Sequence, residues 1–182
     1  NKMPLAVTHI LVPLIIMALI IDIYIKNKDK RKFSLNYVLI AGISGIIPDL
    51  DIAAFWILYF FDFTFEQVHK TILHSLSIPL LFLLLFILFK KANTSRIGKR
   101  KLKLNIIFLM MAFGSFIHLI LDAIFGELII PFWPFNNLAL GINFITYLPN
   151  ELQWMFLPML DGLLLIIWLI YLEFKHKISD FI

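Results

Sequence analysis

Long apolar runs separated by short polar stretches dominate the chain. They extend from Leu5 to Ile25, Tyr37 to Phe61, Thr71 to Phe89, Leu104 to Phe125 and Met155 to Phe174. A helix needs roughly 20 apolar residues to cross a bilayer core of about 30 Å, and each run meets or nearly meets that length. We therefore predict an all-α integral membrane protein, a bundle of about five transmembrane helices that forms a single transmembrane domain over residues 1–182.

Composition supports this class and restricts the chemistry. Hydrophobic residues make up 61% of the 182 residues, against about 45 to 50% in soluble domains. The chain contains no cysteine, which excludes disulfides and thiolate metal sites. A metal ion would have to be bound by histidine and carboxylate.

Basic residues predict the orientation in the membrane. They cluster between the first two apolar runs, between the third and fourth, and after the fifth, at residues 26–32, 90–103 and 175–177. Five crossings place all three clusters on one side, which is the cytoplasmic side by the positive-inside rule. We expect a multi-pass cell membrane protein with an extracytoplasmic N-terminus and a cytoplasmic C-terminus. Its basic loops would contact anionic lipid head groups, and we expect no nucleic acid partner.

The second apolar run contains a helix-breaking signal, the sequence Gly-Ile-Ile-Pro-Asp-Leu-Asp from Gly45 to Asp51. Pro48 lacks a backbone donor and disturbs the preceding turn. The second helix should therefore be broken there. A broken helix within a membrane is tolerated where it lines a cavity.

Polar side chains interrupt four of the apolar runs and their edges. A charged group at the centre of a membrane helix costs roughly 2.5 to 3.5 kcal/mol on insertion scales, so several are tolerated mainly when they face one another. With the predicted topology, these residues all fall in the outer half of the bilayer. We predict one buried polar site formed by His9, Asp49, Asp51, His69, His74, His118 and Asp122.

Two local spacings suit metal ligands. His118 and Asp122 are four residues apart, so in a helix they share a face and could bind one ion or two adjacent ions. His69 and His74 are about 140° apart around a regular helix, so both reach one centre only if His69 lies at or before the first turn. Lys70 would then point into the same region, with a charge suited to a phosphate or carboxylate.

Each of these residues has a simpler interpretation when taken alone. His9 and His69 could be interfacial residues, His118 and Asp122 could hydrogen bond between helices, and Asp49 and Asp51 could cap the helix after the proline. Together they favour a divalent metal site. Imidazole with carboxylate suits zinc, with manganese or iron as alternatives, and seven ligands exceed what one tetrahedral zinc uses. We therefore expect two ions bridged by a carboxylate.

An ordered set of short motifs resembles a known family. It comprises Thr8-His9, Pro48-Asp49-Leu50-Asp51, His69-Lys70 with His74-Ser75, and His118-x-x-x-Asp122 followed by Gly126 and Pro131-Phe132. This set resembles the YdjM-type family, described as LexA-binding, inner-membrane-associated metal-dependent hydrolases. Members usually carry Arg where Lys70 stands and Thr where this chain has Leu73. The order is more distantly similar to zinc-dependent phospholipase C and P1 nuclease, although their later His-x-x-x-Glu pair is missing.

The resemblance implies phosphoester hydrolysis by metal-activated water. On this reading Asp49 or Asp51 is the general base and Lys70 binds the anionic group of the substrate. His9, His69, His74, His118, Asp49 and Asp122 contact metal, and Asp51 bridges two ions or supports a ligand. A site in the outer leaflet would suit a lipid or lipid-linked phosphoester.

Two other classes remain open. The first is a metal ion or proton-coupled transporter, which the concentration of polar residues toward one face disfavours. The second is a structural or interaction protein with a structural metal. Asp161 could support the site or pair locally, and the Pro- and Trp-containing stretch 126–150 is expected to form an aromatic belt at the membrane surface.

Overall fold

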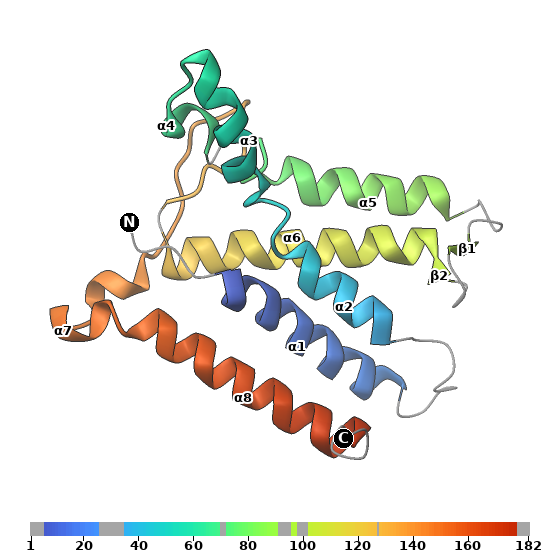
Figure 1. Ribbon diagram of the computed structural model, residues 1–182. Helices are drawn as coiled ribbons and strands as arrows, with labels where there is room; N and C mark the ends of the chain where they lie inside the picture. Colours follow the sequence, from blue (N-terminus) through green and yellow to red (C-terminus); the bar gives the residue numbers. More distant parts are fainter. Residues whose placement is uncertain are drawn as a thin grey trace.

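The computed structural model describes residues 6–25, 35–69, 72–90, 96–97, 102–126 and 128–177. Helices account for most of this part of the chain (Figure 1). The strands β1 (Arg96–Ile97) and β2 (Leu102–Lys103) form a short antiparallel pair, and Ile129 and Leu140 form an isolated bridge. The predicted helical membrane protein is therefore confirmed as a class.

Among the described residues, three helices are long and apolar enough to cross a membrane: α1 (Ala6–Ile25), α6 (Leu104–Phe125) and α8 (Phe156–His176). They coincide with the first, fourth and fifth predicted segments to within a few residues. Many large apolar side chains on these helices face outward, as expected of helices in contact with lipid. These three segments could therefore be predicted from the length of their apolar runs alone.

The second predicted segment is broken, as Pro48 indicated. Helix α2 (Leu35–Ser44) ends before a turn at 45–49, and α3 (Leu50–Leu58) follows, continued by the 3-10 helix η1 (Tyr59–Phe61). Helix α3 and the short α4 (Phe65–Val68) extend away from the ends of α2 and α5 (Figure 1). The run from Tyr37 to Phe61 is therefore two elements with different directions, and α2 alone extends only about 15 Å.

The third predicted segment begins later than expected. Helix α5 spans Ser77–Phe89, and residues 72–76 form turns in place of the predicted first turns after Thr71. The Ser75 side chain donates to the carbonyl of Ile72 and accepts from the Ser77 amide. Pro79 is tolerated in the first turn of α5, where its missing amide would have no helical partner. His74 consequently lies in a turn before the helix and is not within it.

The core is formed where α1, α2 and α6 meet, with Trp168 of α8 at its edge. Leu14, Ala41 and Met110 are among its buried members. A Cβ at Gly114 would lie 2.2 Å from the carbonyl oxygen of Ala41, so only glycine permits this approach of α6 to α2. Gly114 therefore allows a close contact between the two helices. Helix α5 packs against the other side of α6, and α8 packs against α1.

The two ends of the bundle differ in character. The described lysines Lys90, Lys103, Lys175 and Lys177 lie at the end where α5 and α8 finish and α6 begins (Figure 1). At the opposite end run the segment 128–149, which contains the 3-10 helix η2 (Phe144–Tyr147), and the short α7 (Asn150–Gln153). The amide of Leu76 donates to the carbonyl of Pro131 over 2.9 Å, which ties this segment to the start of α5.

Candidate metal centre

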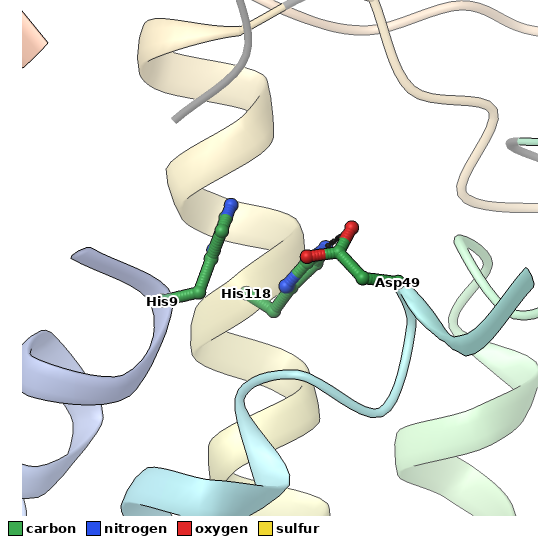
Figure 2. A group of neighbouring side chains, drawn as sticks. All are labelled: His9, Asp49 and His118. Carbon is green, nitrogen blue, oxygen red and sulfur yellow. Dashed lines mark ion pairs between the residues drawn. The ribbon is translucent and has the colours of Figure 1, made fainter. Parts of the chain in front are cut away.

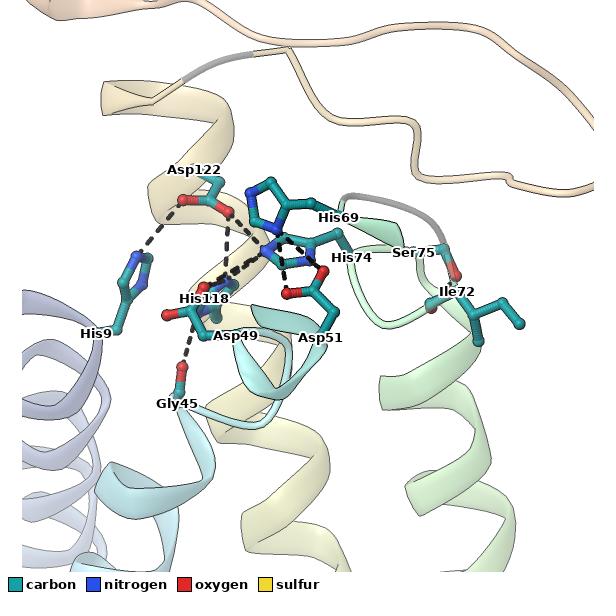
Figure 3. A network of polar contacts seen from close by, with 10 residues as sticks. All are labelled: His9, Gly45, Asp49, Asp51, His69, Ile72, His74, Ser75, His118 and Asp122. Atoms are coloured by element: carbon teal, nitrogen blue, oxygen red, sulfur yellow. Dashed lines mark hydrogen bonds and ion pairs between the residues drawn. The ribbon is translucent and has the colours of Figure 1, made fainter. Parts of the chain in front are cut away.

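The seven residues predicted to form a polar site converge at the end of the bundle away from the lysines (Figure 3). Four parts of the chain supply them: the start of α1, the α2–α3 turn with the start of α3, the stretch between α4 and α5, and the end of α6. All but Asp49, which is partly exposed, are buried. Buried charges and imidazoles are stable only when paired or bound to metal.

Four side-chain atoms within this cluster lie close to one another. His74 Nε2 and His118 Nε2 lie 3.3 Å apart. Asp122 Oδ2 is 3.5 Å from the first and 3.2 Å from the second, and Asp49 Oδ1 is 3.6 Å and 3.7 Å from them. Ligands at about 2.0 to 2.2 Å from a tetrahedral zinc lie about 3.3 to 3.6 Å from one another. The atoms of His74, His118 and Asp122 therefore have the spacing to hold one metal ion, with Asp49 Oδ1 beside both nitrogens. These four atoms are called the cage below.

The orientation of His118 is fixed from the backbone. Its Nδ1 donates a hydrogen bond of 2.6 Å to the carbonyl oxygen of Gly45, in the turn that ends α2. This contact places the proton on Nδ1 and leaves a lone pair on Nε2, the atom that faces the cage. Metal-binding histidines are commonly held in this way through the other ring nitrogen.

The orientation of His74 depends on a carboxylate. His74 Nδ1 lies 2.8 Å from Asp51 Oδ2, and His69 Nδ1 lies 3.1 Å from both oxygens of the same carboxylate. Asp51 thus lies behind His74 as seen from the cage, and favours the proton on Nδ1. His74 Nε2 then lies opposite His118 Nε2, a contact that is favourable when a metal ion binds both lone pairs or when His74 carries a second proton on Nε2.

His9 approaches the cage from α1. Its Nε2 is 3.5 Å from Asp122 Oδ1, and its ring stacks on that of His118 with centroids 3.9 Å apart. Figure 2 shows His9 and Asp49 on either side of His118. Among the described residues, three overlapping groups could hold a metal ion: His9, Asp49 and His118; Asp51, His69 and His74; and His74, His118 and Asp122.

Three imidazole nitrogens in the cluster are buried without a hydrogen-bond partner. Within the described residues they are His9 Nδ1, His69 Nε2 and His74 Nδ1, and the last lies 2.8 Å from Asp51 Oδ2 in an ion pair. Buried polar atoms are nearly always satisfied, so orphans of this kind indicate a missing water or ion. The chemistry of the donor set and these orphaned atoms both fit a metal centre with ordered water.

Sequence reasoning found the side chains of the cluster but missed two supporting contacts. The first is the hydrogen bond between His118 and the Gly45 carbonyl, which nothing in the sequence indicates beyond the position of Gly45 in the helix break. Thr8, next to His9, donates through Oγ1 to Asp161 of α8, and both residues are buried. Asp161 therefore pairs with another helix beside the cluster, which its place in an apolar run could have suggested. Lys70 lies outside the described residues.

Comparisons with known proteins assign this chain to a family. Searches of curated proteins and of solved structures found no match. The family model of the YdjM inner membrane protein matches residues 3–178, nearly the whole chain and all seven residues of the cluster. This chain belongs to the YdjM inner membrane protein family.

Proposed function

We propose that this protein is a membrane-embedded, metal-dependent hydrolase that cleaves a lipid or lipid-linked phosphoester from the extracytoplasmic side. The cage carries the proposal, because two imidazole nitrogens and a carboxylate oxygen lie at metal-ligand spacing with a second carboxylate beside them. Imidazole and carboxylate ligands with one position left for water favour zinc, with manganese or iron as alternatives. The cage accounts best for one ion, and the group Asp51, His69 and His74 is the place for a second.

The proposed arrangement in the membrane has five crossings: α1, α2, α5, α6 and α8. Helices α2 and α5 are shorter than a bilayer core, and each is extended at the cluster end by non-helical backbone. Irregular backbone at membrane depth is tolerated where it lines a polar cavity. The lysines at the other end of the bundle support a cytoplasmic C-terminus and an extracytoplasmic cluster.

The roles of the side chains follow from their contacts. His74, His118 and Asp122 would hold the ion, which would supply Lewis acidity and activate a water in its remaining position for attack on the ester. Gly45 and Asp51 keep the two imidazoles turned toward it. Both oxygens of Asp51 are engaged by histidines, which leaves Asp49 as the better proton acceptor.

Asp49 also has the access that a general base needs. Its side chain is 21% exposed, against 4% for Asp51 and 8% for Asp122. A water bound at the cage would therefore be within reach of Asp49 from the open side. Lys70 stays the predicted partner of the substrate's anionic group.

The test is metal content joined to activity. Protein purified in detergent without chelator should carry about one zinc per chain by mass spectrometry. His118→Gln should lose the metal and the hydrolysis of 4-nitrophenyl phosphodiesters, because it removes an imidazole of the cage. Asp49→Asn should lose the hydrolysis, because an amide cannot accept a proton from water. Asp62→Asn removes an exposed carboxylate that belongs to none of the His and Asp groups of the cluster and should change neither metal content nor activity.

Two results would contradict the proposal. If the purified wild-type protein contained no bound metal, the proposed metal centre would be wrong. Stoichiometric metal without cleavage of any phosphoester would favour a structural metal, or a transporter if ion flux into proteoliposomes depended on Asp49.

A further inference from the structure

A groove between α5 and α6 lies next to the cluster. Its volume is about 290 Å³, and apolar side chains line it, among them Leu76 just before α5, Leu80 and Leu83 of α5, and Leu109, Phe113 and Phe116 of α6. Leu80, Leu83 and Phe116 are exposed, so the groove opens on the outer surface of the bundle, where hydrocarbon would surround it.

The groove and the cage are consecutive along the same pair of helices. Helices α5 and α6 lie side by side and run in opposite directions (Figure 1). Leu76 follows His74 by two residues and Phe116 precedes His118 by two, so the end of the groove formed by Leu76 and Phe116 lies within about one helical turn of the depth of the imidazoles. The other end, formed by Leu83 and Leu109, lies deeper toward the lysine end of the bundle.

We propose that this groove binds one acyl chain of a lipid substrate, with the ester held at the cage. The proposal rests on the proposed function and narrows its substrate to a lipid with a hydrocarbon chain next to the phosphoester. A polar cluster able to bind a cation, at the depth where an apolar groove ends, matches the two parts of such an amphiphile.

The role of the groove would be to position the substrate. An acyl chain leaving the bilayer for the groove exchanges one apolar environment for another, so little hydrophobic driving force is gained. Fixing the chain instead holds the ester close to the reacting groups, and a displacement of about 1 Å at such a site can cost a hundredfold in rate.

Two neighbouring leucines of α5 provide a matched test. Leu80→Trp fills the groove, whereas Leu81→Trp adds the same bulk at an exposed position outside its lining. With dodecyl 4-nitrophenyl phosphate, Leu80→Trp should lower the rate about tenfold, while methyl 4-nitrophenyl phosphate should change by less than about twofold. Leu81→Trp should leave both rates at the wild-type level. If both variants changed the two hydrolysis rates equally, the proposal that the groove binds an acyl chain would be wrong.

A second measurement does not depend on catalysis. Wild-type protein in phosphatidylethanolamine vesicles is irradiated with phosphatidylglycerol that carries a diazirine in one acyl chain, and labelled peptides are mapped by mass spectrometry. Labels should concentrate on residues 76–83 and 109–116, and Leu80→Trp but not Leu81→Trp should remove them. Labels spread evenly over α5, α6 and the exposed face of α8 would overturn the proposal, even in an active hydrolase.

The two proposals can fail separately. Labels confined to the groove in a protein without phosphoesterase activity would support the lipid site and contradict the hydrolase. Because the chain has no cysteine, Leu80→Cys carries a single thiol. A disulfide-linked dimer of this variant would place a second copy at the groove and overturn the acyl-chain proposal.

Discussion

At the scale of single residues, the cluster depends on which nitrogen of each histidine is free. His118 donates a hydrogen bond from Nδ1 to the carbonyl of Gly45, and the Nδ1 atom of His74 faces the carboxylate of Asp51. In both residues Nε2 is left for the cage, although the supporting groups differ. Asp51 thus acts on the cage through His74, and lies too far behind it to share a tetrahedral ion with His118.

Asp51→Asn tests this supporting role. The amide keeps the size of the side chain but loses the charge that favours a proton on His74 Nδ1. Zinc affinity should fall about 10- to 100-fold, as is typical when such a partner of a metal ligand is removed. Competition with a fluorescent chelator in detergent measures it. Asp62→Asn is the control, and an unchanged affinity in Asp51→Asn would mean that His74 is oriented without Asp51.

At the scale of elements, two irregular turns create the site. The break after α2 brings Asp49 and the Gly45 carbonyl toward α6, and the late start of α5 leaves His74 on a turn that faces them. The break also passes close to α1: a Cβ on Gly45 would lie 1.9 Å from the carbonyl oxygen of His9. Glycine is therefore required where the turn, α1 and α6 meet.

Gly45→Ala should damage the centre without touching any of its side chains. The added methyl group would push the turn away from α1 and displace the carbonyl that holds His118. We expect loss of bound zinc and a lower melting temperature in detergent, read by mass spectrometry and by circular dichroism.

Gly162→Ala is the matched control, because a Cβ at Gly162 has no atom within 4 Å among the described residues. Alanine is also the better helix former, so α8 should tolerate the change or gain slightly in stability. If both variants kept their zinc, close packing at Gly45 would not be needed for the site.

At the scale of the whole molecule, polarity is divided between the two ends. The lysines lie at one end and the cluster at the other, with apolar helices between them. On the lysine side, Lys175 pairs with Asp22 over 2.8 Å, and Tyr171 donates to the same carboxylate, which joins α8 to α1. Such asymmetry suits a protein with one fixed orientation in the membrane.

Single cysteines in this cysteine-free chain measure that orientation. Phe135→Cys, at an exposed position on the cluster end, should react with a membrane-impermeant maleimide on intact spheroplasts. Lys177→Cys, at the other end, should react only after permeabilisation. The reverse pattern would place the cluster on the cytoplasmic side and contradict an extracytoplasmic substrate.

The sequence by itself determined the class, the membrane segments with long uninterrupted helices, the break at Pro48 and the members of the cluster. These features depend on local or compositional physics: the length of an apolar run, the missing amide of proline, and the cost of polar groups in lipid. Lys70 stays a prediction, because it lies outside the described residues.

Only the tertiary structure decided how the cluster is arranged. The two aspartates Asp49 and Asp51 are equivalent in sequence, yet one faces the cage and the other lies behind His74. The start of α5 and the direction of α3 were also missed, since hydrophobicity continues through both. The tautomer of His118 is set by a carbonyl 73 residues away. Such assignments depend on atoms brought together by packing between helices, which no local pattern in the chain encodes.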